Sequence, residues 1–210
     1  MSRDIVLLQG YPGSGKSSAA TQLAETYNNP DYDQLAHYSV GNHLRGIING
    51  TIESTQTAHI LEQSEVLAVS QRLDDHVVNE VVKEHLATLP ARSITLIDAY
   101  PLYVDQIPEF QRNVTELSAK VLGVVEIEID PKIAFGRIIQ RGTRTHEDHA
   151  DVAFAQRRID EHTTDCLPTT VALGRIYPTL HIDGSRTSSE VVTLLDEAID
   201  ILAARETGIQ

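Results

Sequence analysis

The sequence predicts an α/β protein of three layers, in which helices cover both faces of a mostly parallel five-stranded sheet. Three observations favour this fold class. A glycine-rich loop at residues 10–17 follows an apolar run and precedes a helical pattern. A second apolar run, residues 94–98, is bounded by prolines and ends in an acidic residue, as a buried parallel strand can. Short apolar runs alternate with helical patterns along the remaining chain, which is typical of strands joined by helical crossovers.

The glycine-rich loop matches the phosphate-binding pattern G-x-x-x-x-G-K-[ST] without a gap. It reads Gly10-Tyr11-Pro12-Gly13-Ser14-Gly15-Lys16-Ser17. The glycines let successive backbone N–H groups point at phosphate oxygens, and the helix that starts at Lys16 adds its positive dipole end. Lys16 is expected to reach the β and γ phosphates of ATP, and Ser17 is expected to hold Mg²⁺. A flexible turn that carries a lysine by coincidence is the alternative, which the flanking strand and helix disfavour.

The length of the chain, 210 residues, allows one domain with a full core. No apolar run is long enough to cross a bilayer, and the first residues lead straight into a strand, leaving no room for a signal peptide. The single cysteine, Cys166, excludes a disulfide framework and favours a cytoplasmic protein. We interpret it as a packed or surface thiol rather than a nucleophile.

The formal net charge of −13 disfavours nucleic-acid binding, because that role needs a basic face. ATP is itself an anion, so the few basic side chains are expected to gather where it binds. The positions of the arginines are therefore informative.

After the first helix, residues 27–33 are rich in turn formers and predict a loop, and a short strand follows at 36–39. Residues 41–45 open a helix, and the region from 51 to 89 shows helical patterns only. Within it, apolar pairs at 60–61 and 66–67 indicate one helix, and apolar residues four apart between 73 and 86 indicate another.

The strand at 94–98 brings Asp98 to the sheet edge at which the phosphate loop also ends. In that position an aspartate holds Mg²⁺ directly or through a water molecule. The alternative is an aspartate that only starts the turn at 98–101, and the presence of Lys16 disfavours it.

A helix is predicted over residues 104–120, an alternating strand over 124–129, and a further helix from Asp130. On this further helix, Arg137 and Arg141 are four residues apart and share one face. Two arginines just past a strand end can clamp phosphates or stack on a base, although a solvated basic face is the alternative.

Residues 142–151 are polar without an apolar period and predict a surface loop of the kind that closes over a site. His146 and His149, with acidic neighbours, offer metal ligands, but a solvated acidic lid explains the same composition and is preferred. A helix over 152–166, a strand within 177–184 and an amphipathic helix over 188–204 complete the chain.

Several separated motifs, in their order along the chain, resemble the adenylate kinase family of nucleoside monophosphate kinases. The matching segments are the phosphate loop, Ser39-Val40-Gly41-Asn42-His43-Leu44-Arg45, Leu96-Ile97-Asp98-Ala99-Tyr100-Pro101, Gln106, Arg137-Ile138-Ile139-Gln140-Arg141-Gly142, Arg144, Arg158-Ile159 and His181-Ile182-Asp183-Gly184-Ser185. The resemblance covers nearly the whole chain. It implies a single phosphate-loop kinase domain over residues 1–210 that is a monomer, with a helical acceptor-binding insertion at 40–88 and a short lid at 142–151.

On the donor side, the resemblance implies that Arg137 lies against the adenine of ATP and that Arg141 touches phosphate. Arg144 and Arg158 would surround the transferring group once the lid closes.

On the acceptor side, the resemblance implies that the segment with Gly41 and Arg45 grips the acceptor monophosphate, and that Gln106 binds its base.

The sequence departs from the family pattern on the acceptor side. Leu102 stands where the family has an arginine that pairs with the acceptor phosphate. Loss of a charged donor from a buried phosphate site costs about 2–5 kcal/mol. Either His43 or Arg72 replaces it, or the acceptor is not an ordinary nucleoside monophosphate. The other departures are Val40, Asn42 and Ala99, where the family has Thr, Asp and Gly.

Three functions are compatible with these residues. The first is transfer of the γ-phosphoryl group of Mg·ATP to a nucleoside monophosphate, with small-molecule nucleotides as the binding partners. The second is phosphorylation of a hydroxyl of a nucleoside or sugar, for which Asp98 is the candidate base. The third is a nucleotide-gated binding protein with little turnover, which the intact lid-side arginines disfavour.

Overall fold

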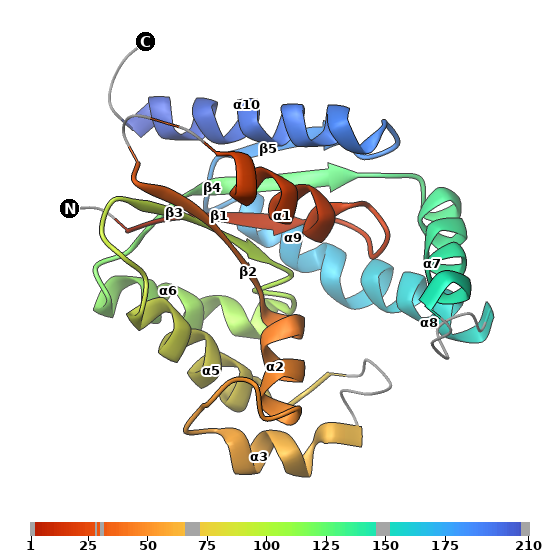
Figure 1. Cartoon of the computed structure of the whole chain (residues 1–210), viewed down its shortest axis with the longest axis horizontal. Helices are drawn as coiled ribbons and strands as arrows, with labels where there is room; N and C mark the ends of the chain where they lie inside the picture. Colours follow the sequence, from red (N-terminus) through yellow and green to blue (C-terminus); the bar gives the residue numbers. More distant parts are fainter. Residues whose placement is uncertain (1–2, 28, 30–31, 66–71, 146–151, 207–210) are drawn as a thin grey trace.

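The computed structural model describes residues 3–27, 29, 32–65, 72–145 and 152–206. Its centre is a five-stranded sheet in the order β2-β3-β1-β4-β5, and every strand pair is parallel. The strands are β1 (Arg3–Gln9), β2 (Gln34–Ser39), β3 (Ser93–Asp98), β4 (Lys120–Glu128) and β5 (Thr179–Asp183). Helices lie on both faces of this sheet (Figure 1), so the predicted three-layer fold is confirmed.

The central strands β1 and β3 are almost entirely buried because both faces of the sheet are covered there. Residues 5–8 of β1 are fully buried, and all six residues of β3 are buried. The strand register aligns the carboxyl ends: Asp98 of β3 pairs with Leu8 of β1 and with Ser39 of β2. The residues that follow these three strands therefore start from one edge of the sheet.

One face of the sheet is covered by α1 (Lys16–Thr26) and α10 (Ser188–Glu206). The other face is covered by α5 (Asp75–Ala87), α6 (Ile107–Glu116) and α9 (Leu167–Gly174). Each group of helices closes a separate apolar cluster against the sheet, and alternate strand residues such as Val124 and Val125 point into different clusters.

Two helical regions lie outside these layers (Figure 1). The helices α2 (Val40–Ile48) and α3 (Thr57–Glu62) follow β2, within residues 40–88, which the sequence analysis predicts to be the acceptor-binding insertion. The helices α7 (Pro131–Thr145) and α8 (Val152–Glu161) follow β4 and pack on each other around a small core that includes Ile129 and Ile159. A 3-10 turn, η1 (Val104–Gln106), precedes α6.

The structure corrects several predicted boundaries. The helix predicted to reach Lys120 ends at Glu116, because Ser118 has a positive φ of 50° and Lys120 already starts β4. The helix predicted over 152–166 is α8 followed by a π-helical turn, η3 (His162–Cys166), which leads directly into α9. The early end of α6 and the π-helical turn do not change the spacing of apolar residues, so this spacing does not predict them.

The first four residues of the predicted lid loop are helical, because α7 continues to Thr145. The remainder of that lid, with His146 and His149, lies outside the described residues. So do Val66 and Leu67, on which part of one predicted helix rested.

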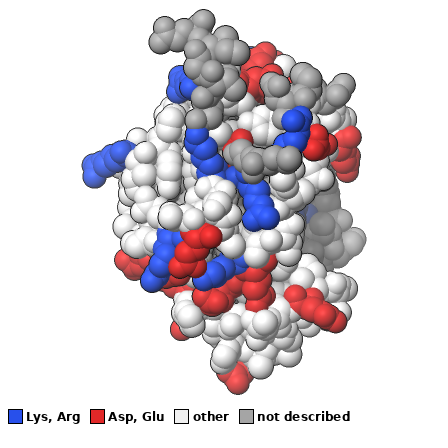
Figure 2. Space-filling view, turned by 90° about the vertical axis from the view of Figure 1, so that its left-hand side faces the viewer, with Lys and Arg blue, Asp and Glu red and all other residues white. Residues whose placement is uncertain are grey.

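The surface carries charges of both signs. On the face shown in Figure 2, basic and acidic side chains are interspersed. Within the described ranges, no helix combines the length and the apolar character that a membrane span requires.

Candidate active site

The phosphate loop connects β1 to α1 at the carboxyl edge of the sheet. Gly10 has a φ of 130°, a conformation that side chains with a Cβ rarely adopt. A Cβ at Gly10 would also lie 2.4 Å from the carbonyl oxygen of Ile127, and one at Gly13 would lie 2.8 Å from that of Ala134. The loop is therefore pressed against the end of β4 and the start of α7, and only glycine fits at these two contacts.

The Lys16 ammonium lies inside this loop. Its Nζ donates to the carbonyl oxygens of Gly10 at 2.6 Å and Tyr11 at 2.9 Å. Burial lowers the pKa of Lys16, the charge of Asp98 opposes that effect, and the nearby positive charge of Arg158 adds to it. An anionic phosphate in the loop would compensate the buried charge, which is the chemistry expected of a phosphate cradle.

Ser17 and Asp98, the two residues predicted to hold Mg²⁺, lie in contact, and the Ser17 hydroxyl donates to Asp98 Oδ2. Asp98 is 4% exposed, and its second oxygen, Oδ1, has no hydrogen-bond partner among the described residues. Burial by itself would raise the pKa of Asp98. The contacts with His37, Lys16 and Ser17 outweigh burial and lower it, so the carboxyl is ionised at neutral pH.

His37 is a site residue that the sequence analysis missed. Its Nε2 lies 3.6 Å from Asp98 Oδ2, and its Nδ1 lies 3.0 Å from the hydroxyl of Thr21 on α1. It belongs to β2, next to β3 in the sheet, and nothing in its own segment marks it as functional. The strand order β2-β3, which a sequence alone does not fix, brings it to Asp98.

Arg137 joins three segments at the edge of the phosphate loop. Its Nη1 donates to the carbonyl of Gly184 at 2.8 Å and reaches that of Gly13 at 3.4 Å, while its Nη2 reaches that of Ser185 at 3.4 Å. The guanidinium therefore lies between the phosphate loop and the turn after β5.

Arg141 lies one helical turn further along α7. It lines an open pocket of about 400 Å³. The other lining residues come from α1, and they are Ser17, Ser18, Thr21, Gln22 and Glu25. Arg144 lies in the last turn of α7, and its side chain is outside the described residues.

The segment η3 rests on the phosphate loop. The ring of Tyr11 lies 4.3 Å from the ring of His162, and the Tyr11 hydroxyl is 3.0 Å from that of Thr163. Burial, together with the positive charges of Lys16 and Arg158, lowers the pKa of His162 to about 3. The helix that carries Arg158 is thus held against the loop through uncharged side chains, a contact that the sequence analysis did not predict.

Cys166 ends the same turn and is buried, in agreement with its interpretation as a packed thiol. Burial, with a contribution from Glu161, raises its pKa to about 12. A thiol in this state is a poor nucleophile.

The acceptor segment starts where β2 ends. The Ser39 hydroxyl caps α2 by accepting from the N–H of Asn42, and the Asn42 amide oxygen accepts from Arg45 Nη2 at 2.6 Å. A Cβ at Gly41 would lie 3.5 Å from Arg45 Nη2, so the guanidinium folds back over this glycine. Asn42, one of the departures from the family pattern, holds Arg45.

Gln106 is buried, and both ends of its amide are bonded. Its Oε1 accepts from the N–H groups of Leu102 at 2.8 Å and Tyr103 at 3.2 Å, and its Nε2 donates to Asp75 Oδ1 at 2.9 Å. Gln106 therefore fixes the turn that contains Leu102.

Arg72 lies at the same turn. Its guanidinium is 4.1 Å from the ring centre of Tyr103, and it forms ion pairs with Asp75 and with Asp105. The ring of the other candidate cation, His43, lies edge-on to the ring of Tyr38, with the two centres 5.3 Å apart.

These features define a phosphate-loop protein. A buried parallel strand leads into a glycine loop that surrounds a lysine, and the first turn of the following helix contacts an aspartate at the end of a neighbouring strand. A family model described as an AAA domain matches residues 9–153, more than half of the chain. The chain belongs to this AAA domain family, and its relatives place it in the adenylate kinase-like branch of phosphate-loop proteins.

The relatives share modest identity with this chain. The adenylate kinase of Campylobacter jejuni subsp. jejuni serotype O:23/36 is 27% identical over 199 residues, which are 94% of this chain and 96% of the relative. That of Streptococcus sanguinis is 30% identical over 143 residues, 66% of this chain and 62% of the relative. That of Listeria innocua is 29% identical over 136 residues, 65% of this chain but only 58% of the relative.

Proposed function

We propose that this protein transfers the γ-phosphoryl group of Mg·ATP to a nucleoside monophosphate. The observation that carries the proposal is the meeting of two segments at neighbouring strand ends. Ser17 contacts Asp98 at the end of β3, and the charge of Lys16 is near enough to lower the pKa of Asp98. The segment with Arg45 begins at Ser39, the register partner of Asp98. A donor and an acceptor phosphate bound by these two segments would lie next to each other.

The chemistry needs no strong general base, because an acceptor phosphate already carries an attacking oxygen anion. The residues act by alignment and by neutralising charge. The loop N–H groups and Lys16 would bind the β and γ phosphates, and Arg45 would orient the acceptor. Arg158 is close enough to Lys16 to affect its pKa and would contribute charge beside the transferring group.

Arg137, held between the loops at Gly13 and Gly184, is the proposed contact for the adenine of ATP. Arg141 and Arg144 follow it along α7 and are proposed to contact phosphate, as in the related family. Closure of the lid would exclude water that otherwise hydrolyses ATP.

Magnesium fits the pair of Ser17 and Asp98. Asp98 Oδ1 is buried and has no hydrogen-bond partner in the part of the chain that the structure describes, and the Ser17 hydroxyl lies beside Oδ2 of the same carboxylate. These are oxygen ligands of the kind that Mg²⁺ prefers. When bound, the ion would neutralise charge on the phosphate oxygens. Asp98 would hold it directly or through a water molecule.

A kinase for hydroxyl acceptors would need Asp98 as its base. The contacts that lower the pKa of Asp98 make it a weak base, which favours a phosphate acceptor. A binding protein with little turnover would be expected to lose the arginines around the γ-phosphate, whereas Arg141 and Arg158 are retained. Both alternatives nevertheless define outcomes of the test.

The test measures ADP formation from Mg·ATP with nucleoside monophosphates, nucleosides and small sugars as acceptors. The relatives are named adenylate kinases, so AMP is the first acceptor to use. We expect ADP only with monophosphate acceptors, and a loss of at least about 100-fold in Lys16→Ala. ADP formed only with hydroxyl acceptors would refute the proposal. ATP binding without turnover, measured by calorimetry, would favour the binding protein.

A further inference from the structure

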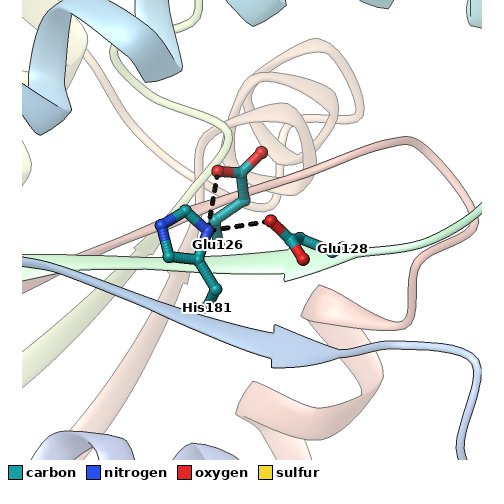
Figure 3. Close-up of side chains that lie close together, drawn as sticks. All are labelled: Glu126, Glu128 and His181. Atoms are coloured by element: carbon teal, nitrogen blue, oxygen red, sulfur yellow. Dashed lines mark ion pairs between the residues drawn. The ribbon is translucent and has the colours of Figure 1, made fainter.

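Three metal-ligating side chains gather on one sheet face at the β4–β5 pair. Glu126 of β4 is the register partner of His181 of β5, and Glu128 follows two residues later on β4. Since side chains two apart in a strand share a face, all three project from the same side of the sheet. Figure 3 shows one ring nitrogen of His181 facing the carboxylates of both Glu126 and Glu128.

The distances suit coordination of one ion. Nδ1 of His181 lies 3.3 Å from Glu126 Oε2 and 2.9 Å from Glu128 Oε1, and the three ligand atoms all lie within 4.8 Å of one another. Ligands about 2.0–2.1 Å from a tetrahedral Zn²⁺ are separated by about 3.3 Å. Small rotations of surface side chains would therefore complete the coordination without moving the strands.

The charges also favour a cation. Within the described part of the chain, neither glutamate forms an ion pair with a lysine or an arginine. The Glu126 side chain is only 17% exposed, so its charge is partly removed from water. A single positive charge would neutralise only one of the two carboxylates, whereas a divalent ion would neutralise the negative charge of both. Glu128 and His181 are more than half exposed, which leaves an entry path and a position for water.

We propose that Glu126, Glu128 and His181 bind one Zn²⁺ ion at a site distinct from that of Mg·ATP. The donor set favours Zn²⁺ over Mg²⁺, because imidazole nitrogen suits Zn²⁺ while Mg²⁺ prefers oxygen ligands only. With ligands on both strands, the ion would cross-link β4 and β5 close to Gly184, whose carbonyl oxygen accepts a hydrogen bond from Arg137. The proposed magnesium ligands come instead from α1 and β3.

The experiment uses the full chain with any affinity tag removed, after treatment with a chelator and in the absence of nucleotide. Co²⁺ is titrated as a spectroscopic probe and displaced with Zn²⁺, and Zn²⁺ binding is measured by calorimetry. We expect one equivalent of Co²⁺ with the intense visible absorption of four-coordinate cobalt. We expect His181→Ala and Glu126→Gln each to weaken Zn²⁺ binding by at least about 10-fold.

Two controls separate this site from others. His59→Ala removes an exposed histidine of α3 and should leave Zn²⁺ affinity unchanged. The double variant His146→Ala/His149→Ala, in the predicted lid, should also retain it. If His181→Ala does not fold, the isosteric Glu126→Gln and Glu128→Gln decide the question. The proposal is overturned if wild-type protein takes up no Zn²⁺, if binding persists in these variants, or if only the lid variant loses it.

Discussion

His37 Nε2 lies 3.6 Å from Asp98 Oδ2, although the two residues are on different strands and 61 positions apart in the chain (98 − 37). The same imidazole contacts Thr21 through Nδ1, so it connects α1 to the proposed magnesium ligand. Its contact with Asp98 helps to hold the pKa of that carboxyl low. We regard His37 as a positioning residue for Asp98.

Replacement of this imidazole should weaken the use of magnesium. In His37→Ala, Asp98 loses a partner that stabilises its ionised form, so its pKa should rise and its orientation should loosen. The Mg²⁺ concentration that gives half-maximal ADP formation should increase about 10-fold, which is the effect of losing an outer-shell partner.

His37→Gln, which can restore an N–H donor, should recover part of this loss. His76→Ala, at an exposed position of α5, is the matched control. An unchanged Mg²⁺ dependence in His37→Ala would show that the contact is only structural.

His162 should make stability depend on pH. Its pKa is about 3 in the folded protein, against 6.5 for an ordinary histidine. Between these values the unfolded chain binds the proton and the folded protein does not, so the free energy of unfolding decreases as the pH falls below 6.5. The contribution is about 1.4 kcal/mol per pH unit.

His162→Gln should therefore flatten the stability profile between pH 7 and about pH 5, as measured by urea unfolding. His59→Gln, at an exposed position, should keep the wild-type slope. The same slope in His162→Gln as in wild type would contradict the assignment.

Gly10 and Gly136 offer a matched pair of glycine substitutions. In Gly10→Ala, the new Cβ meets the Ile127 carbonyl and the φ of 130° is strained, which should lower the free energy of unfolding by about 1–3 kcal/mol. Gly136 lies inside α7, and no atom of the described residues outside the backbone of that helix lies within 4 Å of its Cβ position, so Gly136→Ala should raise stability by about 0.5–1 kcal/mol.

Urea unfolding and ATP calorimetry measure both effects. Gly10→Ala should also lose ATP affinity, since the loop cannot keep its shape, while Gly136→Ala should retain it. If the two variants had equal free energies of unfolding, close packing would not be the reason why position 10 requires glycine.

The sheet and the phosphate loop could be predicted from sequence because their signals are local. Four apolar residues before a glycine loop indicate β1, and the apolar run that ends at Asp98 indicates β3. The contact of His37 with Asp98 depends on which strands are neighbours, and no local pattern encodes it. The packing of Tyr11 on His162 depends on the π-helical turn η3, which the apolar period does not reveal.

Arg72 should supply acceptor-side charge that Leu102 cannot. Its guanidinium lies over Tyr103, next in sequence to Leu102, and is 40% exposed, so an acceptor phosphate could reach it. Arg72→Ala should raise the KM for the monophosphate about 10-fold, equivalent to about 1.4 kcal/mol, with the KM for ATP unchanged.

Lys83→Ala is the control for a lost surface charge, because Lys83 is 36% exposed and pairs with Glu116 at 2.8 Å. Adding Leu102→Arg to Arg72→Ala should restore the lower KM, since an arginine at 102 would start from the same turn that Gln106 fixes. A rise in the KM for ATP, or equal effects of Arg72→Ala and Lys83→Ala, would place Arg72 outside the acceptor site. Its pairing with Asp75 and Asp105 would then serve only to hold the start of α5 against η1.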